Sequence, residues 1–369
     1  MGPPDSASAG PPAFVSVLDA ALDRVRPASD EWRARGAIRL DRLTKPPGSL
    51  GRLEEIALRL CGIQETVELD TARRRIVVCA ADHGVATEGV SAYPPEVTAQ
   101  MVANFLRGGA AINALAAAAH ADIRVVDVGV SGEVVSGGAH AHLVSRRVRR
   151  STRNMLEEPA MTHAELFAAL QVGFDEADSA AADAVRLLGL GEMGIGNSTS
   201  ASAITAALTR LPADRVTGRG TGIDEHTLTK KIRTVERALE QHRLDPGAPL
   251  EILRHVGGLE IAALCGLCLG AAGRRMAIIT DGFIATSAAM LAVALCPAVS
   301  PYLFAAHLSP EPGHAVQLEW LGLRPLLTLE MRLGEGTGAA LAMNVIGAAA
   351  TAFTSMATFE SGGVSDRMS

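Results

Sequence analysis

Residues 187–199 read Leu-Leu-Gly-Leu-Gly-Glu-Met-Gly-Ile-Gly-Asn-Ser-Thr, a short apolar run that leads into a glycine-rich segment. The apolar residues at 187–190 predict a buried strand, and the segment from Asn197 to Arg210 predicts a helix. A glycine-rich connection from a strand to a helix N-terminus points backbone N–H groups at a bound anion. The stretch therefore predicts a strand–loop–helix unit whose loop either binds an anion or is a tight turn with an ordinary Asn/Ser cap.

The same pattern of short apolar runs and longer helical segments extends from about residue 75 to residue 310. Alternation of strands and helices is typical of an α/β protein with parallel strands. We therefore predict a Rossmann-like, mostly parallel sheet flanked by helices. Further strands are expected at 76–81, 123–130, 276–280 and 302–305. Helices are expected at 96–119, 162–184, 225–241 and 334–359, and an irregular basic segment at 134–153.

The segments on either side of this region have helical patterns only. Residues 15–70, interrupted at 45–49 by Lys-Pro-Pro-Gly-Ser, and residues 318–369 are expected to pack as a smaller helical domain built from both chain ends. Residues 71–317 would form the larger α/β domain. Residues 1–14 are rich in proline and small polar residues, and we expect them to be a disordered lead-in.

The composition excludes several classes of protein. With 48% hydrophobic residues and a net charge of −6 over 369 residues, the chain is unlike a long disordered protein. Aromatic residues make up only 3%, too few for the stacking platforms of single-strand binding, so no nucleic-acid partner is expected. The N-terminus has no secretory-signal pattern, and five cysteines fit a reducing cytoplasm.

Two local patterns resemble those of a membrane protein and of a metal or redox protein. Residues 282–306 carry no charge, as in a membrane span, but Pro297 and Pro301 favour a buried helix followed by a buried strand, so no membrane is expected. Cys265 and Cys268 have the C-x-x-C spacing. A lone pair inside an apolar run is more typical of a core than of a metal or redox site.

Polar clusters follow the predicted strands. Because ligands bind at the carboxyl ends of strands in open parallel sheets, these clusters predict one binding site on that edge. The clusters lie at 82–84, 191–199, 218–224, 281 and 307–313.

Residues 189–194 also match the dinucleotide fingerprint G-x-G-x-x-G. The match lies late in the chain, and no strand ending in an acidic residue follows at the spacing that ribose recognition needs. There is no Gly-Lys-Ser/Thr, so a triphosphate loop is not expected, and a monophosphate fits better. Lys230 and Lys231 begin a helix, which is unfavourable against its dipole and favours a phosphate contact by one of them.

Glu192 and Glu335 each lie inside a run of glycines. Each is either a surface carboxylate in a turn or a group that does chemistry on a closely approaching ligand, and two such sites favour acid–base chemistry.

His83 follows Asp82 at a strand end, where a structural role is slightly favoured over a role in the binding site. No cluster has metal-ligand spacing, so no metal is expected. The five arginines within 146–153 are expected to be solvated rather than to steer a substrate.

In chain order these motifs resemble the nicotinate-nucleotide:dimethylbenzimidazole phosphoribosyltransferase family of cobalamin lower-ligand synthesis. The segments that carry the resemblance are LTKPPGSLGRLEE at 43–55, ADHGV at 81–85, YPPEVTAQMVANFLRGGAAIN at 93–113, GEMGIGNST at 191–199, GRGTGID at 218–224, GGLEIAAL at 257–264, TDGFIATSAA at 280–289 and MRLGEGTGAALAM at 331–343. One departure is Ser-Thr-Arg-Asn at 151–154, where Gly-Thr-x-Asn is expected.

The resemblance implies a cytoplasmic homodimer without cofactor or metal. Its reaction would move the phosphoribosyl group of nicotinate mononucleotide to 5,6-dimethylbenzimidazole, giving α-ribazole 5′-phosphate and nicotinate. The implied general base is Glu335. The implied substrate-binding residues are Glu192, Gly194, Gly196 and Asn197 in the glycine-rich loop, Lys231 and Ser309 at the phosphate, and Tyr93, Pro94 and Met101 around the benzimidazole.

Two alternatives of different class stay open from the residues. One is a dinucleotide-dependent oxidoreductase that uses residues 189–194. The other is a nucleotide- or base-sensing protein that keeps the pocket without turnover, which the presence of Glu335 disfavours.

Overall fold

A six-stranded sheet forms the centre of the chain in a computed structural model, which describes residues 13–134, 143–220 and 222–365. Its strand order is β3-β2-β1-β4-β5-β6, and every neighbouring pair is parallel. The strands are β1 (Arg74–Ala81), β2 (Asp122–Gly129), β3 (Leu143–Ser145), β4 (Leu187–Met193), β5 (Ala277–Thr280) and β6 (Leu303–Ala305). The order reverses between β1 and β4, where open sheets of this kind bind ligands. The predicted Rossmann-like α/β fold is confirmed.

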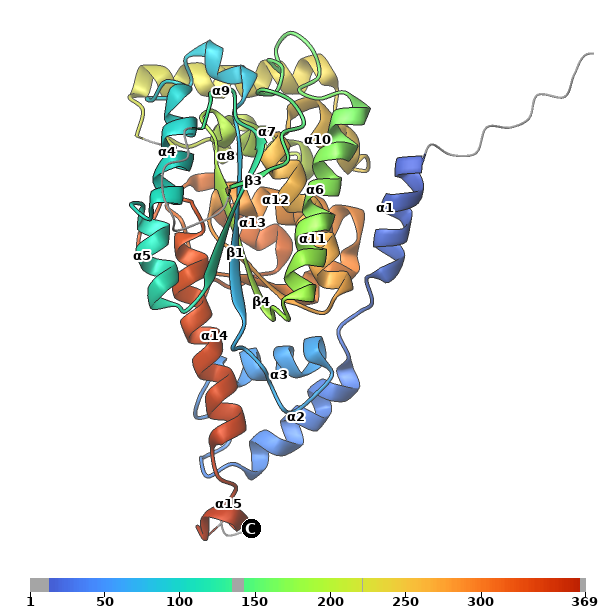
Figure 1. The fold of residues 1–369 in the computed structure, drawn as a ribbon, viewed down its shortest axis with the longest axis vertical. Helices are drawn as coiled ribbons and strands as arrows, with labels where there is room; N and C mark the ends of the chain where they lie inside the picture. Colours follow the sequence, from blue (N-terminus) through green and yellow to red (C-terminus); the bar gives the residue numbers. More distant parts are fainter. Residues whose placement is uncertain (1–12, 135–142, 221, 366–369) are drawn as a thin grey trace, which may run out of the picture.

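Helices cover both faces of the sheet (Figure 1). Helices α4 (Glu96–Arg107), α5 (Ala111–Ala118) and α14 (Thr337–Ser355) lie on one face, and α6 (His163–Ala182) and α11 (Leu259–Gly273) lie on the other. The remaining helices are α1 (Ala13–Arg24), α2 (Asp30–Arg42), α3 (Arg52–Gln64), α7 (Asn197–Thr209), α8 (Ala213–Val216), α9 (Glu225–His242), α10 (Pro249–Val256), α12 (Phe283–Leu295), α13 (Pro312–Leu321) and α15 (Phe359–Gly362), with 3-10 turns η1 (Gly84–Glu88) and η2 (Pro297–Tyr302).

Helix α11 packs closely against α6 because small residues line it. Cys265 and Cys268 are fully buried in this helix, as predicted for core positions. Burial raises the pKa of the Cys265 thiol to about 12, so the thiolate that metal binding and redox exchange require is disfavoured there.

Both chain ends contribute to a second, smaller core below the sheet, at the end where β1 begins (Figure 1). Its buried residues are Leu40 in α2, Leu43 directly after that helix, Ala57 and Cys61 in α3, and Phe353 in α14. Helix α1, however, packs on α11, and the first half of α14 packs on the sheet. The division into domains at residues 70 and 317 therefore stays a prediction, and the predicted lead-in lies almost wholly outside the described residues.

Three local predictions were wrong. Segment 134–153 contains the edge strand β3, which pairs with β2. The stretch 96–119 forms two helices, because Gly108 takes the left-handed conformation that ends α4. Strand β4 continues beyond Leu190 to Met193, since Glu192 pairs in register with Cys79 of β1. Pairing with a neighbouring strand outweighs the low strand propensity of glycine there.

The uncharged stretch 282–306 folds as predicted, with α12 leading through η2 into the buried strand β6. Among the described residues, one helix is long and apolar enough to span a bilayer by composition, namely α14, and 61% of its most apolar window is buried inside the protein.

Candidate active site

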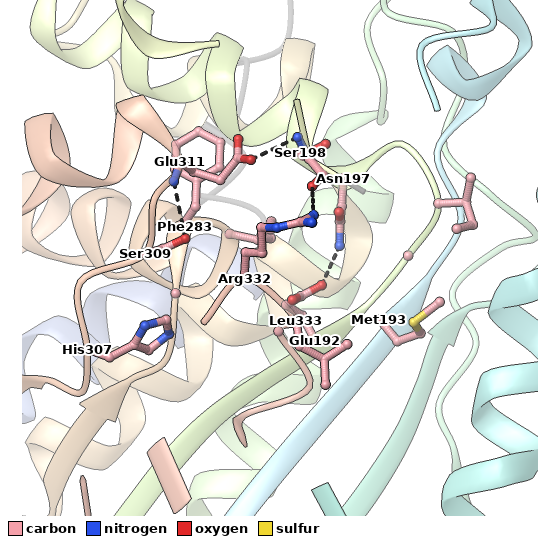
Figure 2. A pocket seen from close by; sticks show the side chains of 16 residues that line it. Glu192, Met193, Asn197, Ser198, Phe283, His307, Ser309, Glu311, Arg332 and Leu333 are labelled. Atoms are coloured by element: carbon pink, nitrogen blue, oxygen red, sulfur yellow. Dashed lines mark hydrogen bonds between the residues drawn. The ribbon is translucent and has the colours of Figure 1, made fainter. Parts of the chain in front are cut away.

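A pocket opens at the carboxyl ends of β4, β5 and β6, close to the point where the strand order reverses. It holds about 700 Å³ of empty space, its open mouth included. Figure 2 shows the side chains of Glu192, Asn197 and Glu311 around it. The lining residues are Glu192, Met193, Gly194, Ile195, Asn197, Ser198, Gly220, Gly282, Phe283, Ile284, His307, Ser309, Glu311, Arg332, Leu333 and Gly334.

One end of this pocket is suited to a phosphate. A smaller hollow, lined by Gly196, Arg219 and Lys231, shares the N-terminal residues of α7 with it. The Lys231 Nζ donates to Ser198 Oγ at 2.8 Å and to the Gly218 carbonyl at 3.1 Å. Burial lowers the pKa of Lys231 to about 8, although the nearby Glu311 carboxylate opposes this shift. A buried amine beside a helix N-terminus is a site that favours an anion.

Glu192, near the end of β4, lines the pocket beside the first residue of α7. Its carboxyl group accepts a hydrogen bond from the Asn197 side-chain amide. Burial, with the charges of Asp281 and Glu260 as further causes, raises its pKa to about 8. Glu192 is therefore mostly protonated at neutral pH, and its carboxyl group carries an O–H that can donate.

Glu335 lies behind the pocket wall, in the loop that precedes α14. It is buried, and its φ of 64° is in the left-handed region. The backbone N–H of Ile112, at the N-terminus of α5, donates to its Oε2 at 3.4 Å. Burial raises the pKa of Glu335, and the Ile112 N–H works in the opposite direction. A carboxylate with a raised pKa is a stronger proton acceptor once it is ionised.

Asp281, which follows β5, holds the loop of Glu335 in place. Its carboxylate accepts hydrogen bonds from the backbone N–H groups of Gly336 at 3.1 Å, Gly338 at 2.6 Å and Ala339 at 3.1 Å. Burial raises its pKa to about 7, against these three donors, which favour the ionised form.

The two glycine-rich segments fit into one another. A side-chain carbon at Gly191 would lie 2.7 Å from the Glu335 carbonyl oxygen, and one at Gly334 would lie 2.3 Å from Glu192 Oε1. Glycine at both positions therefore allows the loop that carries Glu335 to lie against the strand that carries Glu192. From the sequence, glycines around these glutamates indicated either an exposed turn or the close approach of a ligand. In the structure, these two glycines allow the close approach of the two segments themselves.

The residues predicted for this site fall into three groups. Glu192, Gly194, Asn197 and Ser309 line the pocket, and Gly196 and Lys231 line the adjoining hollow. Glu335 does not line either space. Tyr93 is half exposed, Pro94 is exposed and Met101 is half-buried on α4, and none of the three lines the pocket. Helix α4 nevertheless touches the loop, since Thr98 Oγ1 accepts from the Ile195 N–H at 3.1 Å.

The fingerprint 189–194 does not form a nucleotide loop. Residues 189–193 belong to strand β4, so the connection to α7 consists only of residues 194–196. The observed geometry gives no support to a dinucleotide site there.

His83 is placed in a buried structural network. Its Nε2 lies 2.6 Å from Glu260 Oε1 and its Nδ1 lies 2.9 Å from Ser200 Oγ, and it does not line the pocket.

The basic segment at 146–153 is largely ion-paired, and both Arg149 and Arg153 pair with the Glu165 carboxylate. In the ranges that the structure describes, no group of three or more His, Cys, Asp or Glu side chains could hold a metal ion.

Glu311, Arg332 and Asp281 line or support the pocket, and the sequence assigned none of them an individual role. Glu311 and Asp281 do lie in the polar clusters at 307–313 and 281 that predicted a binding site on this edge. Arg332 carries no such signal, because its loop reaches the pocket mouth only through the packing of α14.

Comparison with known proteins shows the same relatives throughout. A profile of a phosphoribosyltransferase family matches residues 25–364. The nicotinate-nucleotide–dimethylbenzimidazole phosphoribosyltransferase of Geobacter sulfurreducens is 49% identical over 352 residues, which are 95% of this chain and 99% of that protein. The enzyme of the same name from Chloroflexus aurantiacus is 48% identical over 354 residues, 96% of this chain and 100% of that protein. A crystal structure of the enzyme of this name from Thermus thermophilus superposes with a TM-score of 0.86 at 50% identity, covering 92% of this chain and 100% of that one.

Proposed function

This chain belongs to the phosphoribosyltransferase family that it matches over residues 25–364, and on that premise we propose its substrates and the roles of its residues. We propose that it transfers the phosphoribosyl group of nicotinate mononucleotide to 5,6-dimethylbenzimidazole. The products are nicotinate and α-ribazole 5′-phosphate, for assembly of the cobalamin nucleotide loop. The names of relatives about half identical over nearly the whole chain support these substrates.

The observation that carries the proposal is an anion-binding hollow next to buried carboxyl groups. Lys231 and the N-terminus of α7 line the hollow, Glu192 lines the adjoining pocket beside Asn197, and Glu335 lies behind its wall. A nucleotide with its phosphate in the hollow has its ribose C1′ directed toward the carboxyl groups. The pocket is therefore suited to transfer at C1′ of a monophosphate.

The phosphate is held by charge and by backbone N–H groups. The α7 N-terminus supplies the positive end of the helix dipole, and Lys231 has one ammonium proton left after its bonds to Ser198 and Gly218. Ser309, across the pocket, adds a hydroxyl. Two or three such contacts position the sugar and remove much of the entropic cost of the reaction.

The bond change needs one base and no electron acceptor. One nitrogen of the benzimidazole forms a bond to C1′ as the bond to nicotinate breaks, with inversion, and the electron pair leaves on the formerly cationic pyridinium nitrogen. The other benzimidazole nitrogen loses its proton. We assign Glu335 as the acceptor of that proton, because its raised pKa brings it closer to operating pH than an exposed glutamate.

Glu192 serves in its neutral form at physiological pH. A second charged carboxylate beside the phosphate and the nicotinate carboxylate would repel the substrate. With its pKa near 8, Glu192 instead offers an O–H as a hydrogen-bond donor to the nucleotide. Tyr93, Pro94 and Met101 remain the predicted walls of the benzimidazole pocket, next to the loop that α4 contacts through Thr98.

The test is one assay. The protein is incubated with nicotinate mononucleotide and dimethylbenzimidazole, and α-ribazole phosphate is measured for the wild type and for Glu335→Gln. We expect the rate to fall by about 10²–10⁴-fold if Glu335 is the base. Glu319→Gln, an exposed position on α13, is the matched control and should keep full activity. An unchanged rate in Glu335→Gln would remove its assignment as base.

Calorimetric binding measured alongside this assay separates the rival functions. A sensing protein would bind nicotinate mononucleotide without turnover, and an oxidoreductase would bind a nicotinamide dinucleotide instead. We further propose, from the family resemblance, a homodimer in a reducing cytoplasm, where the five free cysteines would stay reduced. Sedimentation of the full chain checks the oligomeric state.

A further inference from the structure

Arg332 extends into the pocket from the loop that precedes α14 (Figure 2). Of the described residues that line the pocket, it alone is a lysine or an arginine. Its side chain is exposed, and its Nη1 donates to the Gly220 carbonyl at 3.4 Å. A guanidinium carries five N–H donors, so most of those on Arg332 remain available to a ligand in the pocket.

The contact with Gly220 places Arg332 next to the proposed phosphate site. A side-chain carbon at Gly220 would lie 3.3 Å from Lys231 Nζ and 2.9 Å from Ser198 Oγ. The carbonyl of the same residue accepts from Arg332. Two cationic side chains therefore meet at Gly220, one buried in the hollow and one exposed to the pocket.

A phosphate is a better partner for Arg332 than this carbonyl is. A single bond of 3.4 Å to a neutral carbonyl is long and weak. A phosphate accepts two parallel hydrogen bonds from one guanidinium, and the opposite charges strengthen both. A phosphate monoester carries a charge of about −2 near neutral pH, which balances Lys231 and Arg332 together.

Arg332 belongs to the same loop as Glu335, the proposed base. The end of this loop next to α14 is fixed, because the Asp281 carboxylate accepts from the N–H groups of Gly336 and Gly338. The other end is not fixed in this way, since none of the described backbone groups at 329–332 forms a backbone hydrogen bond. A phosphate that pairs with Arg332 would hold the loop at this second end.

We propose that Arg332 is a second cation of the phosphate site and that the bound phosphate, through Arg332, positions the Glu335 loop for proton transfer. This inference rests on the proposed function, because it takes nicotinate mononucleotide as the substrate. The phosphate takes no part in the bond change, so its binding energy would serve to orient the base.

Removing the phosphate from the substrate tests this role. Turnover with dimethylbenzimidazole is measured on nicotinate mononucleotide and on nicotinate riboside, which lacks the phosphate, and on the riboside with phosphite added as a separate dianion. The proteins are the wild type, Arg332→Ala, Arg332→Lys and the control Arg237→Ala, an exposed position on α9. Calorimetry gives the affinity of each protein for both substrates.

We expect Arg332→Ala to lose about 10- to 100-fold in kcat/KM on the mononucleotide, with part of the loss in kcat. On the riboside it should match the wild type. Phosphite should speed the reaction of the riboside in the wild type and have little effect in Arg332→Ala. Arg332→Lys keeps the charge without the paired donors and should fall between the two. Arg237→Ala should behave as the wild type does.

Several results would overturn the proposal. An equal loss on both substrates would do so, because Arg332 would then act on the ring carboxylate or on the loop alone. Phosphite activation that survives in Arg332→Ala would exclude the phosphate contact, and a loss confined to KM would exclude the positioning of Glu335.

Binding separates a failure of this inference from a failure of the proposed function. A wild type that binds the mononucleotide without turnover removes the proposed function and the positioning of a base. The phosphate contact is then decided by affinity, because Arg332→Ala should bind the mononucleotide more weakly and the riboside equally well. A wild type that binds neither substrate removes both proposals.

Discussion

Glu192 and Glu335 have the same kind of sequence context, a glutamate inside a run of glycines, but the fold holds them by different means. Glu192 is a strand residue, and its position follows from the register of β4 against β1. Glu335 lies in a loop with left-handed backbone, and its position follows from the bonds that Asp281 makes to the residues after it.

This difference separates two ways of fixing a carboxyl group in a pocket. A strand residue is positioned by many ladder bonds, so no single side chain decides where it lies. A loop residue is positioned by a few bonds to one buried side chain, and the loss of that side chain displaces it. The proposed base is thus the more vulnerable of the two, and the proposed hydrogen-bond donor is the more robust.

The largest effect is expected at Asp281. Asp281→Ala leaves three buried N–H groups without an acceptor, and we expect the free energy of unfolding to fall by about 3–5 kcal/mol. Asp281→Asn keeps one oxygen acceptor and should lose less. Urea unfolding of the three proteins measures this, and transferase activity should fall in the same order, because the Glu335 loop is released.

The opposite result at Asp281 would contradict this view of how the loop is held. If activity and stability stay intact in Asp281→Ala, the loop is held by its packing against Gly191 and the strand alone, and the contrast between the two glutamates disappears.

A smaller effect is expected in the pH dependence of stability through Glu192. Its pKa is raised from 4.5 to about 8 in the folded protein, so the folded state keeps a proton that the unfolded chain releases. Its contribution is full below pH 4.5 and is lost as the pH rises to about 8, where it levels off. Relative to Glu192→Gln, the wild type should therefore lose a few kcal/mol over this range.

Urea unfolding of both proteins at about pH 5, 7 and 9 measures that difference. Asp281 and Glu335 are present in both, so most of their own titration cancels in the comparison. A wild type that gains stability over Glu192→Gln as the pH rises would contradict the assignment of a neutral Glu192.

Much of this site could be predicted from local patterns, and the remainder depends on contacts between distant segments. The strand ends at Ala81, Thr280 and Ala305 follow from short apolar runs, which is why the pocket edge was correctly located. The continuation of β4 through Glu192 depends on pairing with Cys79, more than a hundred residues earlier in the chain. The hydrogen bond from the Gly220 N–H to Glu311 Oε1 likewise joins two segments that no local pattern connects.

The smallest effect tests the backbone alone. At position 335 the left-handed conformation disfavours any side chain, so Glu335→Gly should be more stable than Glu335→Ala by about 1 kcal/mol. At position 192, inside strand β4, the order should reverse, with Glu192→Ala more stable than Glu192→Gly by about 0.5–1 kcal/mol. Both variants of each pair lack the carboxyl group, so its charge and hydrogen bonds cancel within the pair. Thermal unfolding of the four variants decides the matter: the same sign at both positions would mean that the two glutamates do not differ in backbone conformation as the structure has them.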